Sequence, residues 1–285
     1  MPYVRVKTGV VGNMSAFGLL GETEVSDITA QRHGTTTWHD SPSSRRWAVK
    51  RDYMDAQMLD EEDALEILVD LEMGYAQNSS MAMGRKMDKV LIDAATATAV
   101  TGATGTSTSA FDTAAPVSDG TGGNQIAVGG TGLTVDKMRT ARGIFMAREV
   151  GVEEMEAGIA PFVWVTNGAG HQDLLEQTEA TSTDFIGVVI RGGQEQQVRM
   201  PLVEGRITMY MGFRIKISNQ LNLSSTNFIN LAWHQKAMGL AVWGGRTVWV
   251  GQLPEHQLAR GIIVKEHMGA SRVHDRGLLA IVCAP

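Results

Sequence analysis

The longest helical pattern of apolar positions in the chain runs from residue 71 to residue 100. Five residues recur at spacings of three, four or eight positions and therefore share one helix face: Tyr75, Met83, Met87, Leu91 and Ala94. Asp70 is a candidate N-cap, because its carboxylate can accept from the free N–H groups of the first turn. A helix of this length would be a rod about 45 Å long. Since its apolar face is narrow, the pattern predicts a strut laid across a sheet.

The first 55 residues alternate between apolar and polar positions in two places, which is typical of β-strands. The alternation covers residues 1–11 and again residues 47–51, with a polar turn at residues 40–43 before the second strand. These signals predict a long two-stranded arm with a polar tip. An isolated hairpin is only marginally stable in water, so we expect the arm to pack on its own domain or on a neighbouring subunit.

Residues 60–69 predict a short amphipathic helix that begins with four acidic residues. The helix dipole favours negative charge in the first turn. Clustered carboxylates can also hold a divalent metal, but this run lacks the alternating spacing and the glycine of a calcium-binding loop. We therefore expect a solvated helix start and no metal site.

The middle of the chain changes from loop to regular structure. Residues 101–131 are rich in Gly, Thr and Ser and predict a surface loop, or a short hairpin around Ile126 and Val128. Three elements then follow: a helix over 134–149 capped by Thr134, an apolar strand over 162–165, and a helix over about 170–180. Helices and strands in this order indicate an α+β fold.

β patterns dominate the C-terminal part of the chain. Four segments follow one another: two alternating strands joined near Gly212 over 205–218, a strand over 228–233, a helix or strand over 234–243, and a short strand over 246–250. The last two apolar segments lie between residues 257 and 283. They would pair as an antiparallel hairpin around residues 274–277, and such an apolar final strand must be held in a sheet.

Composition and charge narrow the classes of function. The chain has 285 residues, a net charge of −6 and a pI near 5.7, so it lacks the basic footprint of tight, non-specific nucleic-acid binding. The single cysteine, Cys283, excludes an intrachain disulfide and is expected to be a small buried residue. No stretch approaches the about 18 consecutive apolar residues of a membrane span. The N-terminus has no pattern of a secretory signal.

No motif typical of an active site stands out. Seven histidines are scattered without metal-binding spacing, and the Gly-rich region contains no phosphate-binding loop motif. A G-x-S-x-G nucleophile elbow is absent as well. The sequence therefore predicts no cofactor, no metal and no catalytic residue, and it favours a structural protein over an enzyme.

The segment from Asp40 to Ile92 resembles a signature of the major capsid proteins of tailed bacteriophages. The residues that carry the resemblance are Thr37, Asp40-Ser41-Pro42, Ser44-Arg45-Arg46, Asp52-Tyr53, Asp55-Ala56, Leu59-Asp60, Asp70, Tyr75, Gln77-Asn78, Gly84-Arg85, Asp88 and Ile92. Residues 234–241, HQKAMGLA, are similar to the motif that precedes the final sheet of such capsids. Two further matches resemble their apical domain: Gly205 with Gly212-Phe213, and Ser218-Asn219. The resemblance covers most of the chain in the same order.

The resemblance implies a Hong Kong 97-type capsid fold of the α+β class. It divides the chain into four parts: residues 1–52, the N-terminal strand and extended E-loop; 53–132, a peripheral domain with its spine helix at 71–100; 133–245, an axial domain; and 246–285, strands that return to the peripheral domain.

The function that the resemblance implies is assembly and not catalysis. The chain would form pentamers and hexamers of an icosahedral head that encloses phage double-stranded DNA without sequence-specific binding. It would be located in the virion after assembly in the host cytoplasm. The chain begins almost at the E-loop strand, where family members usually have an N-terminal arm. Because the N-terminus shows no scaffolding-like segment, we expect a separate scaffolding protein. A portal and a decoration protein are further expected partners, and a membrane is not.

The resemblance also implies contacts between subunits. The E-loop would lie over the spine helix or peripheral domain of the next subunit, as heterologous contacts in a ring require. Six residues of the arm are candidates for this contact: Trp38, Arg45, Arg46, Trp47, Lys50 and Arg51. Four acidic residues are their candidate partners: Asp60, Glu61, Glu62 and Asp63. Each charge is otherwise an ordinary solvated one, and each tryptophan an intrachain core residue.

Two other classes stay open at this point. An encapsulin-like nanocompartment shell shares the fold but holds protein cargo. A soluble α+β enzyme has only the helix–strand–helix unit in its favour.

Overall fold

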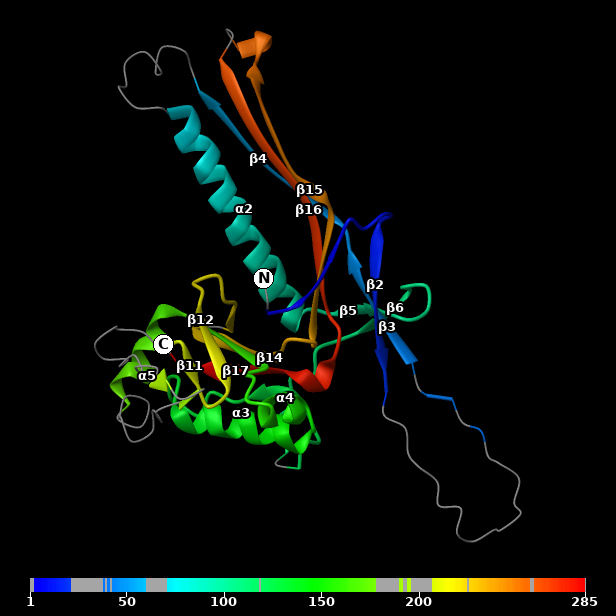
Figure 1. Ribbon diagram of the computed structural model, residues 1–285, viewed down its shortest axis with the longest axis vertical. Coiled ribbons are helices and arrows are strands. Elements are labelled where there is room, and N and C mark those ends of the chain that lie inside the picture. The colour runs from blue at the N-terminus through cyan, green and yellow to red at the C-terminus, as the bar shows by residue number, and fades with distance from the viewer. Residues whose placement is uncertain are drawn as a thin grey trace.

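The computed structural model describes residues 3–21, 38, 40–41, 43–59, 71–117, 119–177, 190–191, 194–195, 207–224, 226–256 and 259–284. Figure 1 shows three parts: a long sheet with a helix along it, a projecting arm, and a body in which helices cover a second sheet. Helices and strands are mixed along the chain, so the expected α+β class is confirmed.

The long sheet has four strands in the order β1-β15-β16-β4. These are β1 (Arg5–Thr8), β15 (Met238–Gln252), β16 (Arg260–Arg272) and β4 (Arg51–Leu59). β1 is parallel to β15, and the other two pairs are antiparallel. The long helix α2 (Leu71–Thr96) lies along the sheet (Figure 1). Buried residues of helix and sheet form the core between them: Met83, Met87, Leu240, Val242, Val264 and Met268.

The long helix expected from the sequence is confirmed, but it ends at Thr96 and not at Val100. The residues beyond it form β5 (Ala99–Thr101), which pairs with a strand of the arm. Strand pairing therefore replaces the last turn of the expected helix, in a stretch where the β-branched Val100 and Thr101 favour a strand. The expected cap, Asp70, lies outside the described residues.

The helix buries two stripes along its length. Met83 and Met87 are buried against the long sheet, as the pattern predicts, while Leu91 and Ala94 are half-buried. Toward its C-terminus the helix instead buries Ile92 and Ala95 against the second sheet. The expected strut is therefore shared by two sheets, which explains why no single apolar face is wide.

The arm is a hairpin of β2 (Met14–Leu20) and β3 (Ser43–Val49). Its base is widened by β5 and β6 (Ser107–Ser109) into a sheet of order β2-β3-β5-β6. The antiparallel pairing of β2 and β3 runs from Met14 opposite Val49 to Leu20 opposite Ser43. A two-stranded arm is present, as predicted from the first 55 residues, but the strand expected over residues 1–11 is not part of it: β1 pairs with β15 in the long sheet, and the arm uses β2 instead. Residues 22–37 lie outside the described part.

The second sheet has seven strands, in the order β11-β12-β8-β14-β17-β7 with β13 beside β14. They are β11 (Met209–Tyr210), β12 (Phe213–Ile217), β8 (Phe162–Thr166), β14 (Asn227–His234), β17 (Leu278–Cys283), β7 (Gln125–Ile126) and β13 (Leu223–Ser224). Helices α3 (Val135–Ala147) and α5 (Gly168–Glu176) cover one face, and the end of α2 covers the other. Five smaller elements complete the described part of the chain. They are the short helix α4 (Val152–Glu156), the paired strands β9 (Ile190–Arg191) and β10 (Gln194–Glu195), and two 3-10 turns, η1 (Pro254–His256) and η2 (Asp275–Gly277).

Several local predictions in this body are confirmed. Thr134 caps α3, because its hydroxyl accepts from the backbone N–H of Lys137 at 3.3 Å. The second helix begins at Gly168, two residues earlier than expected, because the Asn167 side chain accepts from the N–H of Gly170 at 2.8 Å and caps it. β11 and β12 meet at Gly212, whose φ of 81° is a conformation that glycine adopts readily.

The predicted C-terminal hairpin is wrong. β16 pairs with β15 and β4, whereas β17 lies between β14 and β7 in the other sheet. The fully apolar β17 is buried on both faces in the body, while the longer β16 needs the equally long β15 as a partner. The short strand expected over 246–250 is part of β15, and Ile126 pairs in parallel with Ile281 and not in a local hairpin.

Two strand connections form a neck between the sheets. β14 passes into β15 through residues 235–237, and β16 passes into β17 through residues 273–277, which include the 3-10 turn η2 (Asp275–Gly277). The connections are held together, because the N–H groups of Val273 and His274 both donate to the Ala237 carbonyl, at 2.7 and 3.2 Å. The neck is the point from which helix, arm and body diverge (Figure 1).

Candidate functional site at the base of the arm

The arm and the long sheet share one continuous stretch of chain. β3 and β4 are separated only by Lys50, whose N–H donates to the Asn13 carbonyl at 2.9 Å. Beside this point, Gly269 of β16 touches the Val49 backbone so closely that an added Cβ would lie 2.1 Å from the Val49 oxygen. The chain therefore passes from the arm sheet to the long sheet at Lys50. At position 269, beside this passage, only glycine fits.

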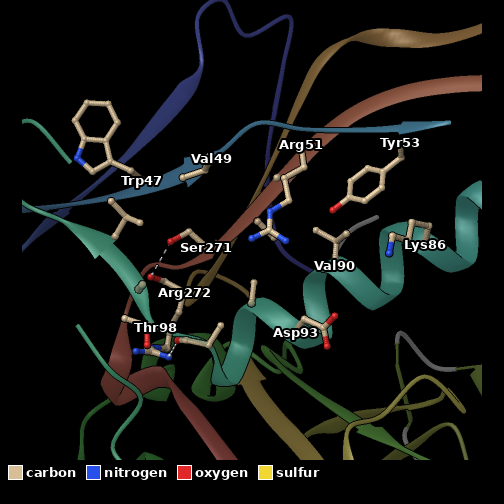
Figure 2. A pocket seen from close by; sticks show the side chains of 16 residues that line it. Trp47, Val49, Arg51, Tyr53, Lys86, Val90, Asp93, Thr98, Ser271 and Arg272 are labelled. Atoms are coloured by element: carbon tan, nitrogen blue, oxygen red, sulfur yellow. Dashed lines mark hydrogen bonds between the residues drawn. The ribbon is translucent and has the colours of Figure 1, made fainter. Parts of the chain in front are cut away.

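A cleft of about 280 Å³ lies between this stretch and the C-terminal half of α2. Figure 2 shows Arg51 reaching into it from the strand above, with Val90 and Asp93 on the helix below. The Lys86 ammonium lies 4.9 Å from the centre of the Tyr53 ring. Within the described part of the chain, Arg51 has no hydrogen bond or ion pair, so the cleft presents an unpaired guanidinium.

At the inner end of the cleft lies Arg272, which is fully buried. Its Nη1 donates to the carbonyls of Ala95 and Ala97, at 3.0 and 2.8 Å, and its Nη2 donates to the Ser109 carbonyl at 3.2 Å. The first two are carbonyls at the end of α2, where the helix dipole favours a cation. Arg272 therefore joins the end of the helix to the base of the arm.

The Asp275 carboxylate links Arg272 to the arm. Its Oδ1 accepts from Arg272 Nε at 2.5 Å, and its Oδ2 accepts from Arg46 Nη2 at 2.6 Å. Arg46 belongs to β3, and only 12% of its side chain is exposed. The buried Nε and Nη1 atoms of Arg46 have no hydrogen-bond partner among the described residues. One carboxylate thus serves two guanidinium groups from different elements.

The candidate contact residues on the arm fall into two groups. Arg46 and Trp47 are engaged within their own chain: Arg46 binds Asp275, and the Trp47 indole N–H donates to the Gly102 carbonyl at 2.7 Å. Lys50 is also engaged within its own chain, since its ammonium lies 3.4 Å from the carboxylate of the exposed Asp52. Trp38 and Arg45 are exposed, Trp38 by 88%.

The four acidic candidates, Asp60, Glu61, Glu62 and Asp63, lie outside the described residues, so the pairing of basic arm and acidic helix stays a prediction. Sequence reasoning missed Arg272 and Asp275. Neither residue belongs to a motif, and nothing local shows that Asp275 meets a strand 229 positions away or that Arg272 reaches the end of α2.

The outer face of the long sheet carries a second candidate surface. Trp249 is opposite Ile263, which is opposite Ala56, so these residues share one face. Their neighbour Val264 points to the other face, into the core with α2. Met54, Met58 and Trp249 on the outer face are 61%, 51% and 44% exposed. We call Met54, Ala56, Met58 and Trp249 the outer apolar patch.

A charged cluster lies beside the arm junction on the same face. Asp52 Oδ1 is 2.6 Å from His267 Nδ1. The hydrogen bond with His267, supported by Lys50, lowers the pKa of the Asp52 carboxyl below its ordinary value. The carboxylate therefore stays charged beside the point where the arm joins the sheet.

Among the described residues, no group of histidine, cysteine and carboxylate side chains could hold a metal ion. Cys283 is buried, as expected, and burial raises the pKa of its thiol. None of the described helices is long and apolar enough to cross a membrane.

Comparison with known proteins identifies the family. A model of the family described as "Phage capsid protein" matches residues 1–284, so the chain belongs to this family of capsid proteins. A capsid protein forms a shell from many copies of itself and is part of the virion. The comparison with curated proteins finds no match. The resemblance stated from the sequence is thereby confirmed, and the nanocompartment and enzyme alternatives are not retained.

Solved structures show the fold. The chain is similar to a structure of Mycobacterium phage Che8, with 17% identity, a TM-score of 0.60, and 95% of this chain and 85% of the other covered. It is also similar to the capsid of cyanophage Pam1, with 11% identity, a TM-score of 0.67, and 99% and 91% covered. The capsid of Helicobacter pylori bacteriophage KHP30 matches with 10% identity, a TM-score of 0.61, and 98% and 88% covered. The expected Hong Kong 97-type fold is confirmed.

Proposed function

We propose that this capsid protein builds an icosahedral head from pentamers and hexamers and that the head encloses double-stranded DNA. The observation that carries the proposal is an arm that projects from the body of a capsid fold, with apolar side chains exposed to solvent. Leu20 on the arm is 75% exposed, and the outer apolar patch is uncovered in the single chain. Such surfaces are typical of sites that another protein covers.

In the proposed assembly, the arm of one copy lies on the long sheet and helix of the next. The exposed Arg45 and Trp38 of the arm, and Arg51 in the cleft, are the residues through which we expect copies to meet. Acidic side chains around Asp60 to Asp63 are the proposed partners of these cations. The contact is heterologous, so a ring closes when five or six copies follow one another.

The proposal also assigns a structural role to each of four parts of the chain. Residues 1–52 serve as strand and E-loop, 53–132 as the peripheral part with α2, and 133–245 as the axial part. Within residues 246–285 we propose the peripheral role for the end of β15 and for β16, which lie in the long sheet, and not for β17, which lies in the seven-stranded sheet. The net charge of −6 suits a container that encloses DNA without binding it tightly.

We propose three further partners of the protein in the head: a separate scaffolding protein, a portal and a decoration protein. Assembly is proposed to take place in the host cytoplasm.

The test is assembly of the purified chain, alone and co-expressed with the other head genes of its phage. Size-exclusion chromatography and negative-stain microscopy should show rings, shells or tubes. A chain that stays monomeric under both conditions would contradict the proposal.

A matched pair of variants tests the arm contact. Arg45→Glu should reduce shell yield and leave the circular dichroism of the unassembled chain unchanged, because Arg45 is exposed. Arg139→Glu on α3, an exposed arginine of the body, is the control and should assemble like the wild type. Normal shells from Arg45→Glu would remove Arg45 from the contact.

A further inference from the structure

The base of the arm is attached by an apolar cluster, Phe17 and Ala48 with Ala241, Trp243 and Val273, and by short strand pairing. β3 pairs with β2 along the arm, but it pairs with β5 through only two residues, Arg46 and Trp47, which lie opposite Thr101 and Val100. Beyond this point the hairpin extends away from the rest of the chain (Figure 1). Apolar contacts at the base are not directional, so a polar side-chain contact beside them can fix the angle of the hairpin.

Asp275 offers that contact. The residue lies in η2, the connection between β16 and β17, and so belongs to the neck that joins the two sheets. Its carboxylate binds Arg46 from the arm at 2.6 Å and the buried Arg272 at 2.5 Å. Arg272 in turn binds the end of α2 and the β6 strand.

We propose that Asp275 is a positioning residue for assembly, which fixes the arm of the capsid subunit to the neck through Arg46. This proposal rests on the proposed arm contact between copies, because a fixed arm matters only if the arm reaches a neighbour. It assigns to Arg46 a role within its own chain, different from that of its exposed neighbour Arg45.

The physical reason lies in the burial of Arg46. The guanidinium is nearly enclosed, and two of its nitrogen atoms have no hydrogen-bond partner in the described part of the chain. A buried cation without its counter-ion is strongly unfavourable. When Asp275 loses its charge, Arg46 gains by moving out to water, and because Arg46 is part of β3 the base of the arm moves with it.

Asp275→Asn is the sharpest single change. The Asn side-chain oxygen can still accept from Arg272 Nε, so the junction of Arg272 with α2 is kept. The change removes the negative charge that Arg46 and Arg272 share. Arg46→Gln makes the complementary change from the arm and leaves the Asp275–Arg272 pair in place. Arg45→Gln, on the same strand but exposed, is the matched control for exchange in the unassembled chain only.

The first measurement is amide hydrogen exchange in the unassembled chain. We expect both Asp275→Asn and Arg46→Gln to speed exchange at least about tenfold in peptides covering 43–50 and 99–109, since the local opening of the arm base becomes easier. Peptides of β8, β14 and β17 should exchange as in the wild type. Arg45→Gln should leave all of them unchanged.

The second measurement is the assembly product. Asp275→Asn should give a lower yield of shells, or shells of irregular size, because arms of variable direction meet the neighbour at variable angles. Unchanged exchange at the arm base together with regular shells would overturn the proposal. Faster exchange with regular shells would also overturn it, since the fixed arm would then have no part in assembly.

A double variant guards against general unfolding. If single variants also speed exchange in the seven-stranded sheet, Arg46→Gln with Asp275→Asn is compared with each single change. A shared contact predicts a double variant no worse than the worse single one, whereas additive effects would contradict it. Because exchange is measured before assembly, a chain that never forms shells refutes the proposed function and still reports on the Arg46–Asp275 contact.

Discussion

At the scale of single residues, buried Lys and Arg side chains donate hydrogen bonds to backbone carbonyls where loops meet strands and helices. The Lys137 ammonium donates to the carbonyls of Val128, Thr131 and Gly132 and, at 3.2 Å, to that of Val282. It thereby fastens the last strand to the loop before α3. Arg148 does the same for residues 120–124 and the Arg276 carbonyl of η2. Each of these cations donates chiefly to main-chain carbonyls, and Arg148 also donates to the Asn124 side chain at 2.8 Å.

Lys137→Met is expected to lower the free energy of unfolding by about 3 kcal/mol, because buried carbonyls would lose their donor. Urea unfolding of the unassembled chain measures the change. The exposed Arg139, paired with Asp136 at 2.8 Å, provides the control, and Arg139→Met should cost less than about 0.5 kcal/mol. An equal loss in the two variants would contradict the structural role of Lys137.

Asp52 provides a prediction of pH dependence. Its pKa is lowered chiefly by the hydrogen bond with His267. Because the folded-state pKa lies below that of the unfolded chain, the group stabilises the fold above the unfolded-state pKa, and this contribution is lost as the pH falls through the lowered value. His267→Gln should therefore raise the pKa of Asp52 toward its ordinary 3.8, as followed by carboxyl NMR titration. The exposed His256→Gln is the control, and no rise in the His267 variant would reject the coupling.

At the scale of elements, the junction of β3 and β4 depends on a close approach of backbones. Gly269 in β16 touches Val49, and Lys50 between the strands is held by Asn13. The same stretch of chain forms the wall of the cleft above α2 (Figure 2). A small displacement here changes both the arm and the cleft.

Gly269→Ala is expected to destabilise the unassembled chain by about 2 kcal/mol or more, because the new Cβ would overlap the Val49 oxygen. Thermal unfolding and hydrogen exchange of residues 43–59 measure the effect. The control is Gly18→Ala in β2, where an added Cβ meets no atom within 4 Å. If Gly269→Ala were as stable as Gly18→Ala, the close approach would not determine the junction.

At the scale of the whole molecule, the single chain leaves its outer apolar patch uncovered. Burying one methionine contributes about 1.5–3 kcal/mol, and a shell repeats each contact many times. The patch lies on the face of the long sheet opposite α2, so no element of the described chain packs on it.

Met54→Gln with Met58→Gln is expected to change the stability of the unassembled chain by less than about 0.5 kcal/mol per site. The yield of shells, measured by sedimentation and microscopy, should fall severalfold. Met146→Gln on α3, which is 43% exposed, is the control on the body. Wild-type yields from the double variant would show that the patch is not a contact between copies.

Much of the fold followed from local patterns. Four local features could be predicted from the sequence: the periodicity of α2, the Thr134 cap of α3, the alternation in β12 and the turn at Gly212. Each depends on residues that lie close together in the sequence, within about one or two helical turns. The resemblance to capsid proteins rested on short motifs in a fixed order. The sequence by itself therefore determined the class of fold, the presence of a two-stranded arm and the long helix, but not which N-terminal strand forms the arm.

Tertiary structure decided which segments pair and which charges meet. The chemistry of β16 and β17 suits one hairpin as well as two different sheets, and only the competing partners β15 and β14 select the second arrangement. Arg46 and Asp275 lie 229 positions apart, and no periodicity relates them. A pattern reports which face of an element is apolar, whereas the neighbour of that face is fixed only when all elements pack together. For this reason the arm was predictable, and its attachment to the neck was not.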